Sequence, residues 1–190
     1  MILKRIVKNT TYLLEIKKSK FITKLFYVTS IEQINQYLLE TKKEYKDATH
    51  YCYAYIIDGT RKASDDKEPS GTAGIPMMEI LNKQNMNYIL CIIIRYFGGI
   101  KLGVGGLVRA YSNSVKEALE HTEIKELEVG YLVRIQTDYK NESKLIELLG
   151  KENILKKEYQ EQLKIEAIIK ESEKESLTPF HMEIVEKIWI

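Results

Sequence analysis

The stretch that decides the fold spans residues 88–121 and reads YILCIIIRYFGGIKLGVGGLVRAYSNSVKEALEH. Its first ten residues, Tyr88–Phe97, are apolar nearly throughout, which is typical of a strand covered on both faces. A glycine-rich loop follows, and from about Gly105 to His121 the apolar residues recur on one stripe at helical spacing. The stretch therefore predicts a buried strand that leads through a loop into a helix packed on the sheet.

Turn and capping signals organise the sequence before this stretch. Aromatic and branched residues on either side of KKSK predict a β-hairpin. Ser30 begins the capping-box pattern SIEQ, and Ile31, Ile34 and Leu38 follow at helical spacing. The elements expected here are a hairpin over Thr11–Val28, a helix from Ser30, a strand over His50–Ile57, a surface loop over Asp58–Gly74 and a short helix over Ile75–Asn82.

The sequence after Lys125–Gly130 begins a fresh strand pattern, so we expect two domains, residues 1–128 and 129–190. The order of elements in the second is β-α-β-β-α-β, that of a ferredoxin-like unit. Its last helix is expected from Ser172. Pro179 would interrupt it, and the alternative is that Thr178 caps a second short helix with Pro179 at its first position. The other elements expected are strands over Tyr131–Thr137, Ile154–Glu161, Leu163–Lys170 and Ile184–Ile190, and a helix over Glu142–Leu149 closed by Gly150.

Composition excludes several classes of protein. The 190 residues carry a net charge of only +2, unlike a bulk polycation. No run reaches the ~18 apolar residues that a membrane helix needs, and Met1–Thr10 has no signal-peptide pattern. We therefore expect a cytoplasmic protein without membrane contact. Cys52 and Cys91 lie in apolar runs and are expected to be reduced core residues.

Charge is unevenly distributed along the chain. The first 46 residues contain 10 Lys or Arg and 4 Asp or Glu, whereas residues 129–190 contain 10 and 12. A basic first segment permits docking on a phosphate surface such as RNA, although lysines on solvated faces are also common.

Seven of the ten glycines fall between Gly71 and Gly106. In GGIKLGVGGLVRAY they run into a helix N-terminus, where free N–H groups attract an anion. The spacing matches neither a P-loop nor a dinucleotide fingerprint, so no cofactor is expected. A tight turn packed against the sheet is the alternative. The candidate phosphate-binding residues are Ser70, Thr72, Arg95, Gly98, Gly99, Lys101, Gly105, Gly106 and Arg109.

Arg95 interrupts the apolar strand. An unpaired buried guanidinium would be strongly destabilising, so a carboxylate meets it or its head emerges beside a ligand site. Strand alternation places Arg95 on the face of Cys91 and Ile93. We expect it at the mouth of a pocket between the 63–74 loop and the 98–106 glycines, with Asp65, Asp66 and Glu68 as candidate partners.

The same acids suggest an alternative, a metal-assisted hydrolase of phosphoesters. In that hypothesis Asp65, Asp66 and Glu68 hold Mg²⁺ and His50 acts as the acid or base. It requires the three carboxylates to converge near His50. A charge run more often keeps a loop solvated, so the prediction is that no catalytic residues and no metal are present.

Four segments together resemble a known family: KKSKF, DATHYCYAY, SDDKEPSGTAGIPM and IIIRYFGGIKLGVGGLVRAYSNSVKEAL. In order and spacing they are similar to the YigZ/IMPACT family of uncharacterised bacterial proteins and eukaryotic translational regulators. The match covers roughly residues 12–122. Lys67 stands where the family usually has Gly, at a turn where a left-handed backbone favours Gly.

The resemblance implies an α+β fold, with an N-terminal domain of the ribosomal protein S5 domain 2-like type and a ferredoxin-like second domain, similar to domains IV and V of elongation factor G. It also implies a role in translation. The leading hypothesis is binding of RNA or the ribosome, or of a translation-regulating protein, through the basic, glycine-rich surface. A protein-binding adaptor that presents tyrosines and the C-terminal sheet is a third alternative.

Overall fold

The structure is a computed structural model that describes residues 2–190. They form two compact units, the first ending at Glu126 and the second spanning Leu127–Ile190. The boundary expected after residue 128 lies just beyond this division. Both units combine helices with antiparallel sheets, which is the α+β class that the sequence predicts. None of the helices in the described range is long and apolar enough to cross a membrane.

A five-stranded antiparallel sheet forms the centre of the N-terminal unit, in the order β2-β3-β6-β4-β5. The apolar strand β6 lies in the middle, and each residue from Ile89 to Ile94 is fully buried, as expected of a strand covered on both faces. The strands are β2 (Thr10–Ile16), β3 (Ser19–Tyr27), β4 (His50–Ile57), β5 (Thr60–Ser64) and β6 (Ile89–Tyr96), with a separate pair of β1 (Lys4–Ile6) and β7 (Ile124–Glu126).

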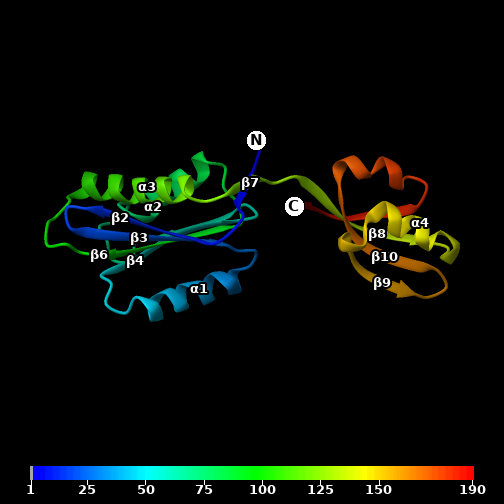
Figure 1. Cartoon of the computed structure of the whole chain (residues 1–190), viewed down its shortest axis with the longest axis horizontal. Coiled ribbons are helices and arrows are strands. Elements are labelled where there is room, and N and C mark those ends of the chain that lie inside the picture. The colour runs from blue at the N-terminus through cyan, green and yellow to red at the C-terminus, as the bar shows by residue number, and fades with distance from the viewer. Residues whose placement is uncertain (1) are drawn as a thin grey trace. The chain divides into compact units, whose positions relative to one another are not determined.

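Helices cover both faces of this sheet (Figure 1). α2 (Gly74–Lys83) and α3 (Val104–Glu120) lie on one face, and α1 (Ile31–Glu44) lies on the other. Ser30 caps α1 by accepting a hydrogen bond from the Gln33 amide, as the capping box predicts. Cys52 and Cys91 are buried in the core beneath α2 and α3. Both are free thiols, in agreement with the sequence prediction.

The expectation of a continuous surface loop over Asp58–Gly74 was wrong. Residues Thr60–Ser64 form β5, which pairs with β4 in an antiparallel hairpin. Asp58 and Gly59 make the turn, and both have positive φ (42° and 82°). Asp-Gly is a strong signal for a two-residue hairpin turn, which requires this backbone conformation. Only residues 65–73 remain as an irregular segment.

The C-terminal unit has a four-stranded antiparallel sheet in the order β11-β8-β10-β9. Its core lies on one face and includes Val133, Ile135 and Leu145. The elements are β8 (Val129–Thr137), α4 (Glu142–Leu149), β9 (Ile154–Tyr159), β10 (Leu163–Lys170) and β11 (His181–Trp189), with the short 3₁₀ turns η1 (Tyr139–Asn141) and η2 (Lys151–Asn153) on either side of α4.

The helix expected from Ser172 is absent from this described unit. Two 3₁₀ turns, η3 (Glu171–Glu173) and η4 (Glu175–Leu177), replace it. Pro179 has no N–H to continue a ladder of i→i−4 hydrogen bonds, so a helix from Ser172 could not extend through it. Thr178 keeps helical backbone angles, yet residues 178–180 form a turn and not a second helix. Leu177 is buried and fixes the segment to the core.

Candidate functional site

A pocket of about 440 Å³ lies in the N-terminal unit, where β6 runs into the glycine-rich segment. One side is apolar and the floor is polar. The lining residues come from the start of β4 and the residue before it, the 65–73 segment, β6, the 97–103 loop and the start of α3. They are Thr49, His50, Glu68, Pro69, Arg95, Phe97, Lys101, Leu102, Gly103, Val104 and Leu107. Arg95 lies between the two segments named in the sequence analysis, but it is buried at the floor of the pocket and not at its mouth, because its guanidinium pairs with a buried carboxylate.

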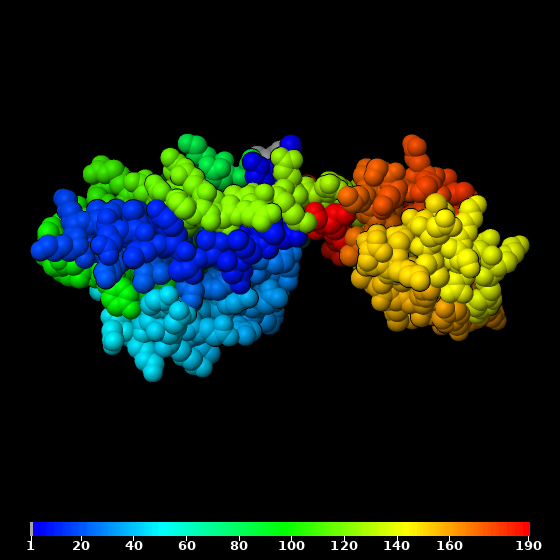
Figure 2. Space-filling view, in the orientation of Figure 1, coloured from blue at the N-terminus to red at the C-terminus, as the bar shows by residue number. Residues whose placement is uncertain are grey.

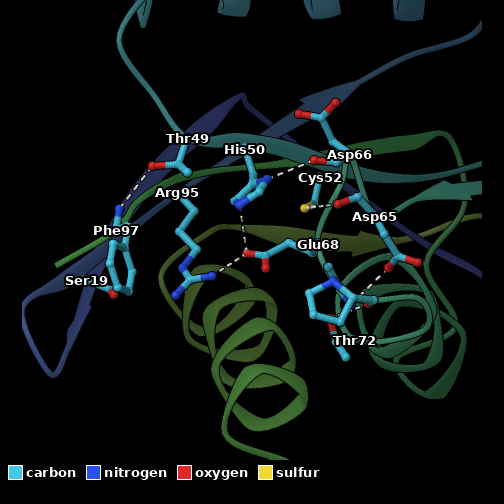
Figure 3. A network of polar contacts seen from close by, with 12 residues as sticks. Ser19, Thr49, His50, Cys52, Asp65, Asp66, Glu68, Thr72, Arg95 and Phe97 are labelled. Atoms are coloured by element: carbon cyan, nitrogen blue, oxygen red, sulfur yellow. Dashed lines mark hydrogen bonds and ion pairs between the residues drawn. The ribbon is translucent and has the colours of Figure 1, made fainter. Parts of the chain in front are cut away.

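Two hydroxyl groups fix the segment that follows β6. The Phe97 amide donates to Oγ1 of Thr49 at 3.1 Å (Figure 3). The Gly98 amide donates to Oγ of Ser19 at 3.2 Å. A Cβ on Gly98 would lie 2.0 Å from the backbone carbon of Lys18, so only Gly fits against the β2–β3 turn. In the space-filling view this hairpin tip (blue) lies beside the green segment after β6 (Figure 2).

The floor of the pocket is a buried ion pair. Nη1 of Arg95 donates to Oε1 of Glu68 at 2.5 Å, and the two side chains are 6% and 3% exposed. Tyr111 of α3 donates to the same oxygen at 2.8 Å. Nε of Arg95 is buried and has no hydrogen-bond partner among residues 2–190. The sequence left two roles open for Arg95, pairing with a carboxylate or standing beside a ligand site. The structure contains the carboxylate pair, and Nε of the guanidinium is left without a hydrogen-bond partner.

His50 lies beside this pair. Its Nδ1 is 2.8 Å from the carbonyl oxygen of Asp66, and its Nε2 is 3.8 Å from Oε1 of Glu68 (Figure 3). A carbonyl oxygen only accepts, so Nδ1 carries a proton in this arrangement. Nε2 is then the nitrogen that lies toward the polar floor.

The other two acids of the loop have structural partners. Oδ1 of Asp65 accepts hydrogen bonds from the amides of Ala73 and Gly74, and Oδ2 accepts one from Gly71. Burial raises the pKa of Asp65, but these three backbone donors outweigh it and hold the pKa below its ordinary value. Asp65 thereby caps α2 from a position well before it in the sequence.

Asp66 accepts a 2.6 Å hydrogen bond from the amide of Tyr51, while Glu68 pairs with Arg95. The carboxylates of Asp65, Asp66 and Glu68 therefore have separate partners and do not converge. Among the described residues no group of three His, Cys, Asp or Glu side chains could hold a metal ion. The arrangement that the hydrolase hypothesis requires is not present there.

Cys52 shares the face of His50 but does not have the character of a nucleophile. Its Sγ donates to the carbonyl oxygen of Asp65 at 3.0 Å and contacts Oη of Tyr111 at 3.3 Å. Burial raises the pKa of the thiol to about 12. The thiolate is therefore scarce at neutral pH.

The candidate phosphate-binding residues divide into two groups. Arg95 and Lys101 line the pocket, Gly98 and Gly99 lead into it, and the first turn of α3 contains Gly105 and Gly106. Arg109 is exposed further along α3 and does not line the pocket. Thr72 is buried and donates to the carbonyl oxygen of Pro69, while Ser70 is exposed outside the lining.

Sequence reasoning missed the residues that shape the site from elsewhere in the chain. Ser19 and Thr49 fix the 97–98 segment, and Tyr111 completes the floor. The sequence did contain a signal for Tyr111, because a tyrosine on the buried stripe of a helix needs a hydrogen-bond partner.

Lys67, which stands where the family usually has Gly, has a φ of 70°. The left-handed turn is therefore kept at this position without Gly.

Fold and site together define a class: a two-unit α+β protein whose N-terminal unit carries a pocket with a buried ion pair at its floor. The model of the Impact N-terminal domain matches residues 17–119. IMPACT family member YvyE of Bacillus subtilis (strain 168) is 38% identical over 174 residues, which are 89% of this chain and 80% of that relative. The chain belongs to the IMPACT family.

Two further comparisons agree with this assignment. IMPACT family member YigZ of Escherichia coli (strain K12) is 42% identical over 110 residues, 55% of this chain and 54% of that protein. A solved structure described as the crystal structure of an hypothetical protein is 28% identical with a TM-score of 0.76, covering 97% of this chain and 98% of the other. That likeness extends over both units.

Proposed function

We propose that the N-terminal unit binds RNA, and that the pocket with its basic margin is the contact through which the protein regulates translation. One observation carries the proposal: a single pocket joins an apolar wall to a lysine and a helix N-terminus. Sites for single-stranded RNA combine these features, because apolar and aromatic side chains contact bases while cations follow the phosphates.

Positive charge at the margin supports phosphate contact. Lys101 is exposed on the pocket lining, shortly before α3 begins. Gly103 caps α3 without a side-chain hydrogen bond, so the N-terminus of this 17-residue helix has no capping side chain. Free N–H groups and the helix dipole favour an anion there. Lys17 and Lys18 at the hairpin tip add exposed charge beside Gly98.

Family membership supports the translational context, because the resemblance implies regulators of translation among the eukaryotic members. The fold assignment is part of the same proposal. The order β11-β8-β10-β9 of the C-terminal sheet supports a ferredoxin-like unit. The N-terminal unit is proposed to be ribosomal protein S5 domain 2-like. Ribosomes and structured RNA are therefore the first ligands to test.

Filter binding of the full chain to ribosomes and to structured RNA over a salt series tests the proposal. Phosphate contacts release counterions, so log K should fall linearly with log salt concentration. Binding that is absent at low salt, or that does not change with salt, would contradict it.

A further inference from the structure

We propose that the pocket takes one unstacked base of a single RNA strand, with Phe97 as a stacking surface and the Arg95–Glu68 pair hydrogen-bonded to the base edge. This inference rests on the proposed RNA binding and specifies its ligand. It assigns the phosphates to the margin of the pocket rather than to Arg95.

The size and walls of the pocket fit a planar ring. Its volume of about 440 Å³ lies in the range of ~300–1,000 Å³ typical of ligand pockets. Phe97 is 47% exposed and Val104 is 65% exposed, and both line it. Large apolar side chains left open at the mouth of a pocket are the surface on which a base stacks.

The floor has no net charge to hold a phosphate. Arg95 and Glu68 neutralise one another, and the carboxylate repels an anion that approaches it. A neutral ligand with both donors and acceptors suits such a floor better. The edge of a base carries both kinds of group side by side.

The hydrogen-bonding capacity of the floor is not filled. Nε of Arg95 is buried without a partner in the described part of the chain. Both side-chain hydrogen bonds of Glu68, from Arg95 and Tyr111, fall on Oε1, which leaves Oε2 without one among these residues. A donor on an occupant of the pocket would supply the partner that Oε2 lacks, whereas Nε is enclosed by protein atoms and an acceptor would reach it only after a side-chain movement.

The margin of the pocket favours RNA over a peptide as the source of the ring. Lys101 and the N-terminus of α3 lie beside the apolar wall, where the phosphates on either side of an inserted base would run. A peptide that inserted an aromatic side chain would leave these groups unused. A base with its phosphodiesters would form hydrogen bonds with the floor, stack on the apolar wall and place its phosphates at the margin.

The test compares two labelled strands of 12 nucleotides, an oligouridylate and a strand of equal charge with abasic spacers at every second position. At one salt concentration the full chain should bind the oligouridylate about tenfold or more tighter, as loss of base stacking predicts. Phe97→Leu should lose this preference and leave the salt slope unchanged. Lys101→Ala should weaken the binding of both RNA strands by the same factor.

Thermal melts of both variants, whose substituted side chains are exposed, confirm that the fold is kept. Equal binding of the two strands by the unaltered protein, or a preference that survives Phe97→Leu, would overturn the base pocket while RNA binding stands. Failure to bind either strand at low salt would overturn the proposed function as well.

Discussion

The guanidinium of Arg95, in the central strand, and the carboxylate of Glu68, in the 65–73 segment, form an ion pair that is almost fully buried. The pair joins the central strand to an irregular segment, which His50 and the Tyr51 amide also hold through Asp66. Tyr111 attaches the same carboxylate to α3. One acidic residue thus connects the loop, the sheet and a helix at the floor of the pocket.

Removal of either Arg95 or Glu68 should leave the charge of the other buried without a counter-ion. Arg95→Met and Glu68→Gln are each expected to lower the free energy of unfolding by about 3–5 kcal/mol, and the double variant should recover a large part of that loss. Urea denaturation of the three variants measures this coupling. Arg134→Met is the control, since its pair with Glu166 is exposed and should cost at most about 1 kcal/mol. An unchanged melt for Arg95→Met would show that the pair does not stabilise the fold.

Gly98 is expected to tolerate no side chain. In Gly98→Ala the Cβ would lie about 2 Å from the backbone of Lys18, so the β2–β3 turn must move, at a cost of about 1–3 kcal/mol or more. Gly105→Ala is a matched control in the same segment. Its Cβ would meet nothing nearer than 4.0 Å, and Ala in a helix should stabilise by up to about 1 kcal/mol. Equal melting temperatures for the two variants would contradict the close contact.

Asp65 should make the stability of the N-terminal unit sensitive to acid. Its folded pKa lies below the unfolded value, so its contribution is complete above about pH 4 and is lost as the pH falls through the folded pKa. Asp65→Asn should cost about 0.5–2 kcal/mol at pH 7, because one amide donor then faces the Gly71 N–H. Denaturation at a series of pH values should show that the difference in free energy of unfolding between Asp65→Asn and the unaltered protein disappears below pH 4. A constant difference would argue against this role.

The two thiols should be unreactive in the folded protein. Burial raises the pKa of Cys52 to about 12 and also raises that of Cys91, and both side chains are inaccessible. Titration with a chromogenic disulfide reagent at pH 8 should detect no thiol in native protein and two in denaturant. Rapid modification of one thiol under native conditions would show that the core around Cys52 opens or that Cys52 is a reactive residue.

Local signals were enough to predict most elements of the fold. The polar turn at Lys17–Lys18 and the capping box at Ser30 specify a hairpin and a helix without reference to the rest of the chain. The β5 strand was missed because its sequence, TRKAS, is polar and lies at a sheet edge, where apolar alternation is weak. Only the Asp58–Gly59 turn reveals it.

The site was predictable in its location but not in its pairing. An arginine in a buried strand requires a carboxylate partner, and the sequence offered three candidates in the neighbouring loop, Asp65, Asp66 and Glu68. The choice among them depends on the path of residues 65–73, where Asp65 turns back to cap α2 and Asp66 binds the Tyr51 amide, which leaves Glu68 for Arg95. Contacts between segments far apart in the sequence, such as Ser19 with Gly98, have no local signature.

The central claim is that the margin of the pocket binds RNA phosphates, and the salt dependence of RNA binding by a charge variant tests it most directly. Lys101→Ala with Lys18→Ala, both at the margin described above, should weaken filter binding and reduce the slope of log K against log salt by about 1 for each phosphate that is no longer neutralised. Lys8→Ala with Lys83→Ala removes the same charge from exposed positions outside the pocket lining, and should leave the slope nearly unchanged. Equal slopes for the two double variants would contradict the claim.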